Sequence, residues 1–68
     1  MIEAGKMYTL PIPVMIRGKV MNPGSPFLVL SYRPTTTERI SAQLSILYEH
    51  GITNMFCINP DTILKEYK

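Results

Sequence analysis

Apolar and polar residues alternate along the first third of the chain, and a period of two predicts an extended strand. The side of this strand that we expect to face the core carries Tyr8, Leu10, Ile12, Val14, Ile16 and Val20. The opposite side includes Pro11 and Pro13, which lack backbone N–H donors and exclude a helix interior. We therefore expect an edge strand or an irregular extended segment.

A second apolar run, residues 27–32, follows the clearest loop of the chain. That loop, residues 22–26, has Pro23-Gly24 at its centre, which suits a type II turn with glycine at the position of positive φ. The run itself is short and apolar nearly throughout, so we expect a strand that is buried on both faces or nearly so.

Residues 37–50 fit a strand and a helix about equally well. As a strand, the even-numbered residues from Ile40 to Tyr48 form an apolar side. As a helix, an apolar stripe would be formed by Ile40, Leu44, Leu47 and Tyr48. A single helix over one sheet would leave an apolar sheet face bare. We therefore favour the strand, and an α+β fold with a helix at about 37–50 is the alternative.

The last third predicts a hairpin, a tight turn and a short final strand. Gly51 can supply the positive φ of a hairpin connection at residues 49–51, and residues 52–58 then alternate. One side of this strand carries Ile52, Asn54, Phe56 and Ile58, and the other carries Thr53, Met55 and Cys57. The Asn-Pro-Asp-Thr sequence at 59–62 favours a type I turn or a single 3₁₀ turn, after which residues 63–64 return to the core.

This order of elements resembles that of SH3-like small barrels. The matching features are a strand that follows Gly5, an irregular excursion at 17–25, a central apolar strand, a hairpin with a glycine tip and a turn before the last strand. The resemblance implies an all-β fold, a five-stranded barrel with a short 3₁₀ turn before its last strand, in a single domain over residues 1–68. The chain has no tryptophan, which the peptide groove of SH3 domains proper carries.

Residues 27–31 also resemble a strand of MazF-type toxins, which share an SH3-like barrel and cleave RNA. This resemblance implies a ribonuclease that depends on Arg33 or His50. In size the chain is similar to the small barrels common among phage and prophage proteins.

Composition narrows the class of protein further. A chain of 68 residues with 46% hydrophobic and 18% charged residues is typical of one ordered domain, and its core is small because so short a chain buries only about 60% of its surface. The single Cys57 excludes an internal disulfide, and with the single His50 it disfavours a closed four-ligand zinc site. No membrane span or signal-peptide pattern is evident. We expect a cytoplasmic protein with no cofactor and no metal.

Two residues are candidates for catalysis, and neither is supported by its neighbours. His50 is the only side chain that ordinarily titrates near neutral pH, and Glu49 lies beside it, but no nucleophile is evident nearby. Cys57 lies in a predicted strand, where a small packing residue is more typical than a reactive thiol. The sequence therefore predicts no catalytic residue and a protein that is not an enzyme.

An apolar strip on the predicted first strand is the candidate partner-binding site. It consists of Met7, Pro11, Pro13 and Met15. An exposed strip of this kind marks a protein contact, and methionine adapts to varied partners. The first hypothesis is a small binding or regulatory module that acts through protein–protein contact or as a homo-oligomer.

The distribution of charge suggests a second hypothesis. The net charge is only +2, but every charge between residues 4 and 37 is positive. Three of these cations, Arg17, Lys19 and Arg33, could form a basic patch with Tyr32 as a stacking platform for nucleic acid. The alternative is that they are ordinary solvated residues of strand faces.

Overall fold

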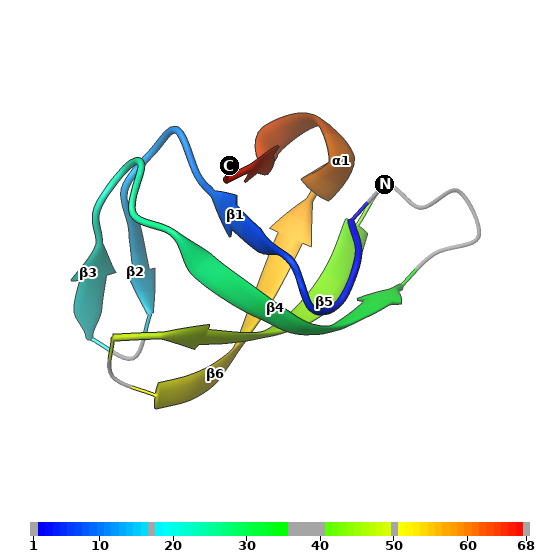
Figure 1. The fold of residues 1–68 in the computed structure, drawn as a ribbon, viewed down its shortest axis with the longest axis horizontal. Coiled ribbons are helices and arrows are strands. Elements are labelled where there is room, and N and C mark those ends of the chain that lie inside the picture. The colour runs from blue at the N-terminus through cyan, green and yellow to red at the C-terminus, as the bar shows by residue number, and fades with distance from the viewer. Residues whose placement is uncertain (1, 17, 36–40, 50, 68) are drawn as a thin grey trace.

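The computed structural model describes residues 2–16, 18–35, 41–49 and 51–67 of the chain. Five strands form one antiparallel sheet in the order β6-β5-β4-β1-β7, and β2 pairs with β3 in a separate two-stranded sheet (Figure 1). The elements are β1 (Met7–Thr9), β2 (Val14–Ile16), β3 (Lys19–Met21), β4 (Phe27–Pro34), β5 (Ser41–Tyr48), β6 (Gly51–Ile58), α1 (Pro60–Ile63) and β7 (Lys65–Glu66). The prediction of a mainly β protein is confirmed.

The five-stranded SH3-like barrel is not confirmed. Among the described residues the large sheet ends at β6 and at β7, and these two strands do not pair. The predicted long first strand is instead divided into β1, β2 and β3, because Pro11 and Pro13 cannot donate to a ladder and Gly18, at φ 76°, lets the chain turn back. The alternation in β1 therefore does not continue into the next strands. Ile12 and Val20, which we expected in the core, are exposed.

Residues 41–48 form the strand β5, which lies between β4 and β6. The alternative of a helix at about 37–50 is wrong for these residues, whereas residues 37–40 and 50 lie outside the described part of the chain. The side chains of Ala42, Leu44 and Ile46 on one face are fully buried, but Leu47, which the helical stripe required inside, is 42% exposed. The strand is more stable than a helix here because it places three consecutive apolar positions of one face in the core.

The core lies on the inner face of the large sheet. Its buried side chains are Ile2, Tyr8, Leu10, Met21, Phe27, Val29, Leu44, Ile46, Met55 and Leu64. Val14 and Ile16 of β2 pack against its margin, so the β2–β3 hairpin covers part of the core, although within the described residues it forms no ladder with the large sheet.

A bulge in β4 changes the direction of its side chains. Val29 pairs with Ile46 and Ser31 pairs with Ser45, which leaves Leu30 without a partner. An unpaired residue of this kind locally bends the strand and offsets the alternation by one position.

The bulge explains why β4 is not buried on both faces, as the apolar run had suggested. Before it, Phe27 and Val29 are buried; after it, Tyr32 packs against the core, whereas Leu30 and Arg33 are exposed. Only one face of β4 therefore belongs to the core.

The turn before the last strand is a single turn of α-helix rather than the expected 3₁₀ turn. The N–H of Ile63 donates to the carbonyl of Asn59 (3.1 Å) and that of Leu64 to the carbonyl of Pro60 (2.9 Å). Proline is suited to this first helical position because its missing N–H would have no partner within the helix. Leu64 is buried, which confirms the predicted return to the core.

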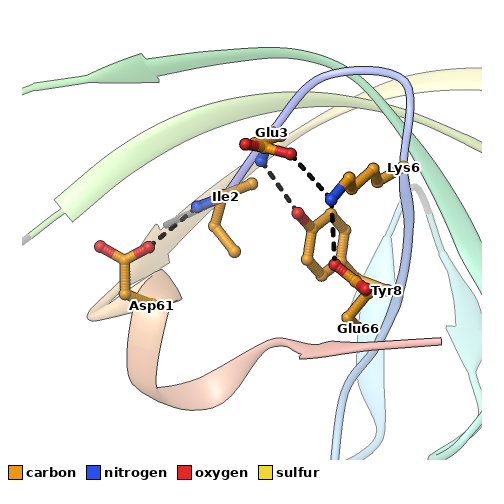
Figure 2. A network of polar contacts seen from close by, with 6 residues as sticks. All are labelled: Ile2, Glu3, Lys6, Tyr8, Asp61 and Glu66. Carbon is orange, nitrogen blue, oxygen red and sulfur yellow. Dashed lines mark hydrogen bonds and ion pairs between the residues drawn. The ribbon is translucent and has the colours of Figure 1, made fainter. Parts of the chain in front are cut away.

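Residues 2–6, the N-terminal arm, are connected to the C-terminal elements by a network of polar contacts (Figure 2). The N–H of Ile2 donates to Oδ1 of Asp61 in α1 (3.0 Å), and the N–H of Glu3 donates to the hydroxyl of Tyr8 (2.9 Å). These bonds hold the buried side chain of Ile2 over one end of the core.

Lys6 completes this network by bridging two carboxylates. Its Nζ lies 2.9 Å from Oε2 of Glu3 and 3.4 Å from Oε1 of Glu66 in β7. The hydrogen bond from Lys6, and then its charge, lower the pKa of Glu3 below its ordinary 4.5. The hydrogen bond and charge of Glu3, followed by those of Glu66, raise the pKa of Lys6 above its ordinary 10.5.

The Lys6 bridge gives stability a pH dependence of known sign. Because the pKa of Glu3 is lowered in the folded protein, its carboxylate stabilises the fold at pH values above the ordinary carboxyl pKa, and this stabilisation is lost as pH falls through the lowered pKa. Because the pKa of Lys6 is raised, its ammonium group stabilises the fold at pH values below the ordinary lysine pKa, and this stabilisation is lost as pH rises through the raised pKa. We expect Lys6→Met to lower the denaturant midpoint slightly at neutral pH, with the difference vanishing in strong acid and strong alkali. Lys65→Met in β7 is the control. A loss that is the same at every pH would contradict the assignment.

Candidate functional site

The β2–β3 hairpin and the strand β6 face each other across a groove. Two hollows follow one another along it, with volumes of about 210 Å³ and 320 Å³. Ile16 of β2 and Thr53 of β6 line both hollows, so the groove is continuous. The first hollow is completed by Lys19, Val20, Met21, Tyr48, Gly51 and Ile52, and the second by Val14, Met15, Asn54, Met55 and Phe56.

The strand β6 presents an open hydrogen-bonding edge to this groove. In the described part of the chain its only ladder neighbour is β5, and the ladder starts at the pair Tyr48–Gly51. A pair that closes a hairpin with two intervening residues exchanges both hydrogen bonds, and bonded and non-bonded pairs then alternate. The even-numbered residues of 52–58 therefore direct their N–H and C=O groups away from β5. The 2.8 Å hydrogen bond from Ser45 Oγ to Asn54 Oδ1 agrees, since facing side chains are closest at non-bonded pairs.

The face of β6 whose side chains point away from the core is strongly apolar. Ile52, Phe56 and Ile58 are 64%, 65% and 58% exposed, whereas Met55 on the inner side is buried. From Gly51 to Ile58 the strand has no charge, no proline and no register shift. Proteins usually protect the edge strand of a sheet with charged residues, prolines or bulges, or by making the strand short. The opposite edge of this sheet is protected in this way, because β7 has only two residues and both are charged.

Ile52, Phe56 and Ile58 were not identified from the sequence as surface residues. A period of two shows which residues share a face, but it does not show which of the two faces is covered. In β6 both faces are apolar, because Met55 and Cys57 occupy the other one. The informative signal was the absence of any charge on either face.

The four residues predicted to bind a partner are all exposed, but they do not form one strand face. Met7 lies on β1, Met15 lies on β2, and Pro11 and Pro13 belong to the segment between these strands, which are in different sheets. Met15 is 70% exposed and lines the second hollow. It is therefore the member of this set that the fold brings to the groove.

The described members of the predicted basic patch are not brought together. Arg17 lies outside the described residues. Lys19 lines the first hollow, whereas Arg33 lies near the far end of β4, at the opposite end of the molecule from β3 (Figure 1). The ring of Tyr32 packs against the core, and its hydroxyl is buried with no hydrogen-bond partner among the described residues. Tyr32 and Arg33 therefore point to opposite faces of the sheet.

The two catalytic candidates form no site that the structure describes. His50 lies outside the described residues. Cys57 is half-buried, its thiol lies 3.6 Å from the carbonyl of Ile58, and burial raises its pKa, so little thiolate exists at neutral pH. The described residues contain no cluster of three or more His, Cys, Asp or Glu side chains placed to hold a metal. In the same residues, no helix has the length and apolarity needed to cross a membrane.

Comparisons with protein-family models, with curated proteins and with solved structures give no match to this chain. The likeness to SH3-like barrels and to MazF-type toxins therefore rests on the order of elements and on residues 27–31.

Proposed function

We propose that this protein is a small non-enzymatic binding module that acts through protein–protein contact. The observation that carries the proposal is the apolar edge of β6, with Ile52, Phe56 and Ile58 all more than half exposed beside an open ladder. Isolated exposed apolar residues are normal on a monomer. Three of them on one uncharged edge are typical of a surface that another chain covers.

The β2–β3 hairpin enlarges this contact surface. Met15 and Val20 form a cross-strand pair on its exposed side, and both line the groove. Met7, Pro11 and Pro13 lie on the adjoining exposed segment and remain candidate contacts. We further propose that the fold is an open variant of the SH3-like barrel, supported by the strand after Gly5, the β5–β6 hairpin and the helical turn before β7.

Affinity capture from cells that express the protein tests this function. Wild-type bait should retain protein partners, or further copies of itself, even after nuclease treatment. Phe56→Thr should reduce this retention at least tenfold, because truncating an aromatic hot spot of an interface costs about 2 kcal/mol or more. Since Phe56 is exposed, the variant should unfold at nearly the wild-type temperature.

The control bait is Tyr67→Thr, which shortens another exposed aromatic residue away from β6. It should retain partners as the wild type does. Retention that disappears with nuclease would favour nucleic acid as the partner, which is the second hypothesis from the sequence. Equal retention by the Phe56→Thr bait would contradict the proposed surface.

A further inference from the structure

We infer that the groove between β6 and the β2–β3 hairpin binds one extended segment of a partner protein, which adds to β6 as a strand and places a carboxylate beside Lys19. This inference rests on the proposed protein-binding function and names the chemistry of the partner. Strand addition to an open sheet edge is a general mode of peptide recognition, in which the main chain gives affinity and alternate side chains give specificity.

The backbone of β6 supplies the affinity. Its even-numbered residues, 52–58, offer outward N–H and C=O groups in a row. At roughly 3.4 Å per residue the eight-residue strand is about 27 Å long, which is enough for a full added strand. No charge or proline along the strand obstructs the approach of a second backbone.

The shape of the groove selects a single strand over a compact ligand. The hollows of 210 Å³ and 320 Å³ follow one another along β6, so the groove is elongated and not one compact cavity. Alternate side chains of an added strand recur about every 7 Å along the same face. Two apolar side chains at positions i and i+2, or i and i+4, would enter the two hollows.

The far wall of the groove disfavours a second copy of this protein as the occupant. Ile16, Lys19 and Val20 of the β2–β3 hairpin stand across from β6. The β6 strand of another copy carries β5 on its other edge, only about 4.8 Å away. That second strand would have to occupy the position of the hairpin, whereas a lone extended segment has two free edges.

Lys19 determines the charge of the segment. Among the described residues that line the two hollows it is the only charged one, and no ion pair joins it to another described residue. An unpaired cation beside apolar walls favours an anionic group on the ligand. The segment should therefore carry Asp or Glu near the Gly51 end of β6 and apolar residues at alternate positions beyond it.

A displayed library of random linear peptides provides the probe. Selection on the wild-type protein should enrich sequences with one acidic residue at one end of a run of alternating apolar residues. Asn54→Pro removes one outward N–H, and Asn54→Ala is its matched control, because both variants lose the bond from Ser45. A selected peptide should bind Asn54→Pro at least tenfold more weakly than Asn54→Ala.

Lys19→Glu tests whether the positive charge of Lys19 binds the carboxylate of the peptide. Lys65→Glu in β7 is the control, because it makes the same charge change away from the groove. The acidic peptide should lose about tenfold in affinity with the first variant and nothing with the second. In the wild type, peptide addition should shift the amide resonances of residues 52, 54 and 56 more than that of Met55. This readout does not depend on any variant folding.

Three results would overturn the inference. The first is that enriched peptides lack the acidic and alternating pattern, or that none is enriched. The second is equal binding to the two Asn54 variants together with unshifted β6 amides. The third is a stable dimer in sedimentation that Asn54→Pro dissociates, which would make a second copy the occupant. Partner capture that still depends on Phe56 would leave the proposed function standing in each case.

Discussion

Leu44→Ala is expected to destabilise the protein by about 3 kcal/mol or more, which is a large share of its total stability. Leu44 lies in the central strand β5, is fully buried, and pairs with Tyr32 and Met55 on either side. Truncating a buried leucine removes its transfer free energy and leaves a cavity that the neighbours fill only in part, for a typical cost of about 2–5 kcal/mol.

The small size of the protein makes this cost decisive. At roughly 0.05–0.15 kcal/mol per residue, a chain of 68 residues has a total stability of only about 3–10 kcal/mol. Urea unfolding followed by circular dichroism measures the change. Leu47→Ala is the matched control, since it is the same substitution on the exposed face of the same strand, and we expect a loss under about 1 kcal/mol. Equal losses would mean that β5 does not present these faces.

Thr53→Pro is expected to cost about 3 kcal/mol or more, whereas Asn54→Pro, one residue further, should cost much less. Thr53 pairs with Ile46 at a hydrogen-bonded position of the β5–β6 ladder. Proline there removes the donor and leaves a carbonyl of the buried Ile46 unpaired, and an orphaned buried group alone costs about 1–3 kcal/mol. The proline ring and its fixed φ add steric strain in a paired strand.

The same comparison checks the orientation of the β6 backbone directly. The N–H of Asn54 points away from β5, and proline is tolerated where the N–H faces outward from an edge strand. Thermal unfolding of the two proline variants, each beside its alanine counterpart, separates the backbone effect from the loss of the side chain. If Asn54→Pro proved the more damaging of the two, the open edge would lie on the other set of residues.

The local chemistry of the chain was sufficient to predict many of its elements. Gly51 marks the β5–β6 hairpin, Pro60 marks the turn before the last strand, and the even-numbered residues of 41–48 identify the inner face of β5. Each of these signals acts within a few residues, where backbone preferences and alternation are strong. The strand at 41–48 was favoured over a helix by considering which faces would remain bare.

The features that sequence reasoning missed depend on contacts between distant residues. Nothing local indicates that Leu30 is a bulge, because its position is defined by the pairing of β4 with β5. The separation of β1 from β2 was hidden by an alternation that runs on through Pro11 and Pro13. The exposure of Ile52, Phe56 and Ile58 on β6 was not predicted, because alternation groups residues into faces but does not say which face the rest of the protein covers.

The hydrogen bond between Ile2 and Asp61 has a consequence for the order of folding. It joins residues 59 positions apart, whereas β4, β5 and β6 follow one another and pair as neighbours. Contacts between distant positions form late because closing a long loop costs more entropy than closing a short one. We therefore expect the β4–β5–β6 meander to become ordered first, with the arm, α1 and β7 docking onto it afterwards. During that interval β6 is already a complete strand with its edge open, so the proposed partner segment could pair with it before the two ends of the chain have met.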